Sequence, residues 1–96
     1  MPVYVQLINW TEKGAAAAKD TTQRAQRARE AAQKMGVTLR EVVWTMGRYD
    51  VVAIFDAPND ETASKFAIGL GVLGFARTET LRGYSEQEIA KIVEGV

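Results

Sequence analysis

The side chains with the clearest chemical potential are Asn9, Thr45 and Asp50, which we expect at the ends of neighbouring strands. Asp50 is the unusual member, because aspartate is depleted in strands and the most apolar stretch of the chain follows it directly. Thr45 is expected opposite Asp50 across a hairpin, with Asn9 beside them at the end of the first strand. Two roles stay open for Asp50. It acts as a base or ligand anchor in a cleft, or it accepts backbone N–H groups and fixes the loop after Trp10.

Aromatic residues form a second group with chemical potential. Trp10, Trp44 and Tyr49 fall on the same strand parity as Tyr4 and Phe55. Such a surface could line a pocket for a flat ligand, or it could be an interface, where aromatic residues are enriched. Both interpretations stay open at this point.

The residue types that are missing exclude several reaction classes. The chain has no cysteine and no histidine, which excludes disulfides, thiolate catalysis, Cys/His zinc sites and histidine general-base chemistry. The run 69–74 fits Gly-x-Gly-x-x-Gly, but we expect it at the end of a helix, where it cannot cradle a phosphate. No metal ligands are identified, and we predict no cofactor.

The composition indicates one small globular domain over residues 1–96, with 47% hydrophobic residues. Twelve basic and twelve acidic residues cancel, so bulk charge favours neither nucleic acid nor an anionic membrane as a partner. The basic residues of the first helical region, among them Arg24 and Arg27, are expected on a solvated helix face. No signal sequence or transmembrane run is recognised, which favours a cytoplasmic location.

The elements follow a simple order. Hydrophobic periodicity predicts strands over Val3–Trp10, 37–46, 49–56 and 75–84, and helices over 23–35 and 61–73. Thr11 can cap a short helical turn, Gly47-Arg48 fits a two-residue hairpin turn, and Ser85 opens a short C-terminal helix. The order β-α-β-β-α-β predicts an α+β, ferredoxin-like fold, with strand order 4-1-3-2 and both helices on one face.

Both faces of this sheet are expected to be apolar. The third strand carries Val52 and Ile54 on one side and apolar residues on the other, and the second carries Val42, Trp44 and Met46 opposite Leu39 and Val43. A lone antiparallel sheet with one face in water shows a cleaner alternation. The pattern therefore predicts self-association through a second sheet, as a homodimer or a larger assembly.

Several motifs together resemble the GYD-domain family. The run Gly47-Arg48-Tyr49-Asp50-Val51-Val52 resembles the signature that names the family, and Thr11–Gly14, Ala57–Glu61 and Gly74–Arg82 resemble its other motifs, with asparagine at position 59 as a departure. The resemblance implies a dimeric α+β barrel, in which two ferredoxin-like subunits join sheet to sheet. It implies no activity.

Three functions are compatible with these features. The first is a non-enzymatic, self-associating domain that binds a small apolar or aromatic ligand. The second is a cofactor-independent enzyme, such as an isomerase or a monooxygenase, that uses Asp50 with Tyr49 or Arg48. The third is a regulatory subunit of another protein, which an exposed apolar patch outside the dimer interface would support. A large apolar cavity with Asp50 or Tyr49 at its wall would favour the enzyme.

Overall fold

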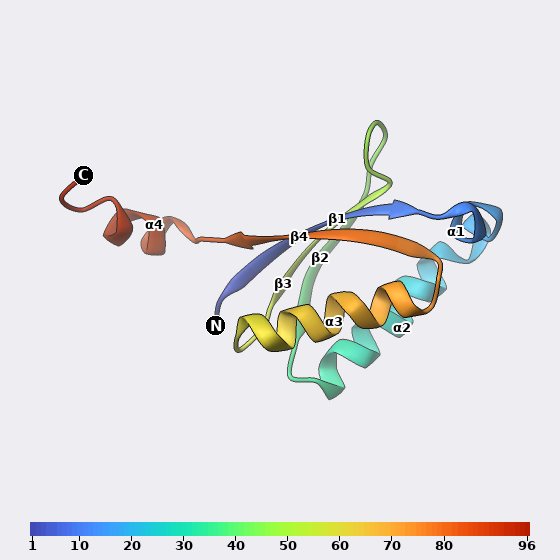
Figure 1. Cartoon of the computed structure of the whole chain (residues 1–96), viewed down its shortest axis with the longest axis horizontal. Helices are drawn as coiled ribbons and strands as arrows, with labels where there is room; N and C mark the ends of the chain where they lie inside the picture. Colours follow the sequence, from blue (N-terminus) through green and yellow to red (C-terminus); the bar gives the residue numbers. More distant parts are fainter.

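The computed structural model, which describes all 96 residues, has a four-stranded sheet with two long helices on one side (Figure 1). The sheet order is β2-β3-β1-β4 and every neighbouring pair is antiparallel. This arrangement confirms the predicted ferredoxin-like fold and its strand order. The elements are β1 Val3–Trp10, α1 Glu12–Ala16, the 3-10 turn η1 Ala18–Asp20, α2 Thr21–Lys34, β2 Thr38–Trp44, β3 Val51–Asp56, α3 Asp60–Val72, β4 Ala76–Gly83 and α4 Glu86–Ile92.

Local capping fixes where several helices begin. The Thr11 hydroxyl accepts a hydrogen bond from the Gly14 N–H and donates one to the Gly74 carbonyl, so it also ties α1 to the loop before β4. Asn59 caps α3, and Ser85 with Glu88 forms a reciprocal capping box at the start of α4. The caps at Thr11 and Ser85 are ones that the sequence predicts.

The core lies between the helices and one face of the sheet. Tyr4, Phe55 and Phe66 form its centre, with ring centroids 5.3 and 5.2 Å apart. Ala32 on α2 and Ala63 on α3 let the two helices approach these rings closely.

A bulge in β2 changes the predicted face of one residue. The pairing with β3 shifts between Leu39 and Glu41, so that Leu39 lies opposite Phe55 and faces the helices together with Val42 and Trp44. The alternation in the sequence had predicted Leu39 on the other face. One extra residue in a strand moves the residues on one side of the bulge to the opposite face of the sheet, relative to those on the other side. A prediction that assumes strict alternation along the strand cannot detect this change.

The connection between β2 and β3 is also wider than the predicted two-residue turn. The strands end at Trp44 and resume at Val51, leaving a loop that the Thr45 N–H closes by donating to the Asp50 carbonyl. The Thr45 hydroxyl donates to the Tyr49 carbonyl at 2.6 Å, and side-chain bonds of this kind compete with a strand ladder. Gly47 has a φ of +112°, so the expected positive φ is present inside the longer loop.

The last helix projects away from the rest of the molecule. Figure 1 shows α4 beyond the end of β4, far from α2 and α3. The radius of gyration is 14.3 Å, whereas a compact domain of this length has about 12.5 Å. Ile89, Ile92 and Val93 lie at helical spacing and are exposed. None of the helices combines the length and apolar character that spanning a bilayer requires.

Candidate functional site

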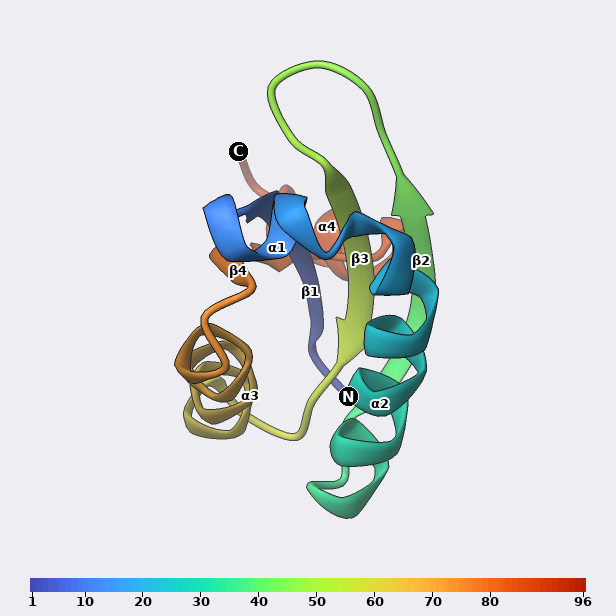
Figure 2. The same ribbon diagram turned by 90° about the vertical axis from the view of Figure 1, so that its right-hand side faces the viewer.

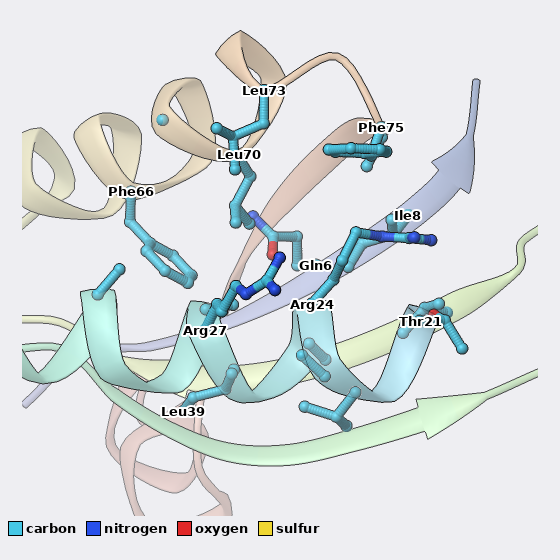
Figure 3. Close-up of a pocket in the computed structure, with 18 of the residues that line it drawn as sticks. Gln6, Ile8, Thr21, Arg24, Arg27, Leu39, Phe66, Leu70, Leu73 and Phe75 are labelled. Carbon is cyan, nitrogen blue, oxygen red and sulfur yellow. The ribbon is translucent and has the colours of Figure 1, made fainter. Parts of the chain in front are cut away.

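A cavity of about 470 Å³ lies between the sheet and the two long helices. Figure 2 shows α2 and α3 on the same side of the sheet, with β1 and β3 visible behind the gap between the two helices, and Figure 3 shows the side chains that line the cavity. This volume is within the range of small-molecule sites. Sixteen of the 22 lining residues are hydrophobic, so the cavity is suited to a largely apolar molecule.

Small residues on the helices explain why this space is open. Helix α2 turns Ala25, Ala28 and Ala31 toward the cavity, and α3 contributes Gly69. Residues three and four apart share one helix face, so the three alanines lie in a row along α2. Their short side chains leave space above the sheet that larger side chains would fill. At Ala25 and Ala28, this face of α2 therefore borders a cavity instead of a filled core.

The floor of the cavity contains one polar side chain, Gln6 in the middle of β1. Gln6 is 1% exposed, and its Nε2 is buried without a hydrogen-bond partner. Figure 3 shows its amide directed into the space between Arg27 of α2 and Leu70 of α3. A buried donor without a partner costs about 1–3 kcal/mol, so the free protein maintains an unfavourable group at this position.

All charged residues of the lining are basic. They are Arg24 and Arg27 on α2 and Lys65 on α3. The Arg24 guanidinium donates to the Ala17 carbonyl at 2.7 Å and lies 4.9 Å from the centre of the Phe75 ring. It is therefore held in place by the protein itself. Arg27 and Lys65 make no hydrogen bond or ion pair within the chain, and both are exposed at the mouth.

The structure brings two of the three aromatic candidates to this cavity. Trp10 and Trp44 belong to its lining, and the Trp44 indole N–H donates to the Thr21 hydroxyl at 3.0 Å. Tyr49 does not join them. It lies in the loop, and its hydroxyl is 3.5 Å from the Glu79 carboxylate on β4, because the wider loop removes Tyr49 from the strand parity.

The polar residues Asn9, Thr45 and Asp50 lie at the end of the sheet and outside the cavity lining. The Asp50 carboxylate accepts the Trp10 backbone N–H at 2.9 Å, and the Asp50 N–H donates to the Ile8 carbonyl. Asp50 thus extends the pairing with β1 by one residue before β3 begins. Thr45 pairs with Asp50 through the backbone, whereas Asn9 lies opposite Arg77 of β4. This geometry matches the structural role considered for Asp50.

Sequence reasoning did not identify Gln6, Arg27 or Lys65 as site residues. Gln6 had a usable signal, because it is the one amide on a strand face otherwise made of Tyr4, Ile8 and Trp10. Arg27 and Lys65 had none, since a basic residue on an amphipathic helix is ordinarily a solvated one. Only the tertiary arrangement of α2 and α3 on one face of the sheet brings these two cations into the lining of one cavity.

One titratable group of the core is clearly perturbed. Burial raises the pKa of the Tyr4 hydroxyl to about 12, and its hydrogen bond to the Asp60 carboxylate, 2.5 Å long, raises the pKa further in the same direction. Tyr4 is therefore neutral at physiological pH and links β1 to the first turn of α3. No group of three or more acidic side chains is arranged to hold a metal ion.

Comparison with known proteins identifies the family of the chain. No curated protein and no solved structure matches it. The model of the GYD domain matches residues 4–93, which covers every strand and helix described above except Val3, the first residue of β1. The chain therefore belongs to the GYD-domain family.

Proposed function

We propose that this protein is a self-associating domain that binds a small apolar or aromatic molecule between its sheet and helices α2 and α3. The observation that carries the proposal is the cavity of about 470 Å³ with a mostly hydrophobic wall. A large, well-formed apolar pocket with a few convergent polar groups is the usual form of a small-molecule site. Four aromatic residues in the wall, Trp10, Trp44, Phe66 and Phe75, suit a flat ligand or an alkyl chain.

The position of Asp50 favours binding over catalysis. The enzymatic hypothesis required Asp50 or Tyr49 at the cavity wall, and neither belongs to the lining. The carboxylate of Asp50 is already bonded to the Trp10 N–H. The lining contains no carboxylate and no tyrosine hydroxyl, and its one side-chain amine, Lys65, is exposed.

Self-association is supported by the opposite face of the sheet. Its centre is apolar, since Val5 lies between Ile54 and Leu81, and Leu7 lies opposite Val52. Val43 and Leu81 are 50% and 43% exposed. Charges of both signs surround this patch, among them Arg77 and Glu79, and a mixed rim can be complementary to itself across a two-fold axis. The occupant that we propose for this face is a second copy of the chain.

A neutral apolar probe tests the binding function. N-phenyl-1-naphthylamine fluoresces in apolar surroundings, and we expect it to bind the wild-type protein. The change Ala28→Leu places a larger side chain into the cavity and should weaken this binding at least about tenfold, equal to about 1.4 kcal/mol. Gln26→Leu is the matched control, because Gln26 lies on the same helix, is exposed and does not line the cavity.

The outcomes are distinct. Loss of probe binding in Ala28→Leu with retention in Gln26→Leu supports the cavity as the site. Equal binding to both variants places the probe elsewhere, on the open sheet face for example, and contradicts the proposal. Native mass spectrometry of gently purified protein then identifies a retained molecule.

A further inference from the structure

We propose that the ligand of this cavity is an amphipathic monocarboxylate, whose acid group lies among Gln6, Arg27 and Lys65. The inference rests on the proposed function and narrows its ligand to one chemical class. It is carried by three observations, namely the sign of the charges at the mouth, the unpartnered amide at the floor, and the apolar remainder of the wall.

The charges of the lining are strongly biased. The chain has twelve basic and twelve acidic residues, yet the lining contains three cations and no carboxylate. Arg24 is bonded to the Ala17 carbonyl, which leaves Arg27 and Lys65 free. These two residues come from different helices, and both belong to the lining. Two cations that line one cavity repel each other, and an anion bound between them converts this repulsion into attraction.

Gln6 supplies the donor that an acid group needs inside the cavity. Its Nε2 is buried and unpartnered, and Figure 3 shows the amide reaching into the cavity that Arg27 also lines. A carboxylate accepts through two oxygens, so one oxygen can take the Gln6 N–H while the other faces the guanidinium or ammonium group. The same contact removes the energetic cost of the unpartnered amide, and charge-assisted hydrogen bonds are stronger than neutral ones.

The remainder of the wall limits the ligand to a single charged group with an apolar body. The cavity is far larger than a carboxylate, and most of its lining is hydrophobic. A second acid group would lie against Trp44, whose indole N–H already donates to Thr21, or against the alanines of α2, which offer no side-chain donor. The body of the ligand is therefore an alkyl chain or a ring system that extends from Gln6 along this apolar surface.

The two tryptophans make the test direct. The chain has only Trp10 and Trp44, and both line the cavity, so tryptophan fluorescence reports its occupancy. The ligands to compare are decanoate and decanamide, because they have the same chain length and nearly the same head-group shape but differ in charge. At pH 7.5 decanoate should bind at least about tenfold more tightly than decanamide, and added salt should reduce the difference because both cations are exposed.

Charge-removing variants locate the acid group. Arg27→Gln and Lys65→Gln should each weaken decanoate binding about three- to tenfold, the effect of one partly exposed charge pair. Both should leave decanamide binding unchanged. Lys34→Gln is the matched control, because it removes one charge from an exposed residue of α2 outside the lining. Since all three positions are exposed, folding should be retained.

Failure of this inference can be separated from failure of the proposed function. If N-phenyl-1-naphthylamine binds in an Ala28-dependent manner but decanoate binds no better than decanamide, the carboxylate assignment is wrong and the cavity remains a site for neutral molecules. If Lys34→Gln weakens decanoate binding as much as Arg27→Gln does, the preference for decanoate reflects the overall charge of the protein. That result would also contradict the carboxylate assignment. If neither probe nor decanoate binds, both proposals fail.

Discussion

The two faces of the sheet differ in what they leave unsatisfied. The face covered by α2 and α3 buries an amide, Gln6, that has no partner. The open face has no helix over it, yet its centre is apolar around Val5 and Ile54. A face in water is ordinarily polar and a covered face is ordinarily apolar. Here the covered face contains an unexpected polar group, and the open face contains an unexpected apolar patch.

This comparison indicates two separate molecular partners. A buried donor is stabilised by an acceptor that enters the cavity, whereas an exposed apolar patch is stabilised by another apolar surface. Because the sheet separates the two faces, a ligand and a second copy of the chain can bind at the same time. Substitutions on one face should therefore leave the other function intact, and the predictions below test that independence.

The largest effect is expected on the open face. Ile54→Glu places a carboxylate at the centre of the proposed interface, once from each copy of a symmetric dimer. We expect the dimer to weaken by at least about hundredfold, because an unpaired charge buried in an interface costs several kcal/mol. Light scattering at micromolar concentration measures this change, and Ser64→Glu on the exposed surface of α3 is the control. A wild-type protein that is already monomeric would falsify the assignment.

Asp50→Asn tests the residue at the end of the sheet that both faces share. The carboxylate accepts the Trp10 N–H at 2.9 Å, and asparagine keeps the shape but removes the charge. We expect a loss of about 1–3 kcal/mol in the free energy of unfolding, the range for a charge-assisted bond to a partly buried group. Urea denaturation at neutral pH gives the value. A more stable variant that remains dimeric would instead make Asp50 a functional residue.

Gln6→Leu should act in the opposite direction on stability. The change removes an unpartnered amide from the covered face, so the ligand-free protein should gain about 1–2 kcal/mol. The same variant should lose part of its preference for decanoate over decanamide, while its dimer stays intact. Denaturant midpoints and fluorescence titrations measure the two effects. Loss of stability would show that the amide has a partner and would weaken the case for a ligand acceptor.

Tyr4→Phe has its clearest effect at alkaline pH. The pKa of Tyr4 is raised from 10.0 to about 12 by burial and by Asp60, so the unfolded chain releases the hydroxyl proton first as pH rises. The stabilisation is fully present below pH 10 and is lost as pH increases toward 12. Phenylalanine cannot ionise, so the variant should lose less stability than the wild type between these values. Parallel slopes in denaturant midpoint at pH 8, 10 and 11 would contradict this assignment.

Local signals in the sequence were sufficient for most of the secondary structure and the fold class. Val3–Trp10 was predicted with its observed bounds, and the caps at Thr11 and Ser85 lie where predicted. These features depend on residues within a few positions of one another, through alternation, helical spacing or a side chain bonded to a nearby N–H. The family resemblance depends on similarly short motifs.

Tertiary structure alone decided the features that position the site. The bulge beside Leu39 depends on how β2 fits against β3. Asp50, at the end of the loop between β2 and β3, is held by the backbone N–H of Trp10, which is forty positions away in the sequence. The alanine stripe of α2 was visible in the sequence, but whether it fills a core or borders a cavity depends on its distance from the sheet. For the same reason, Arg27 and Lys65 become one site only because α2 and α3 lie on the same face, which no pattern within either helix can specify.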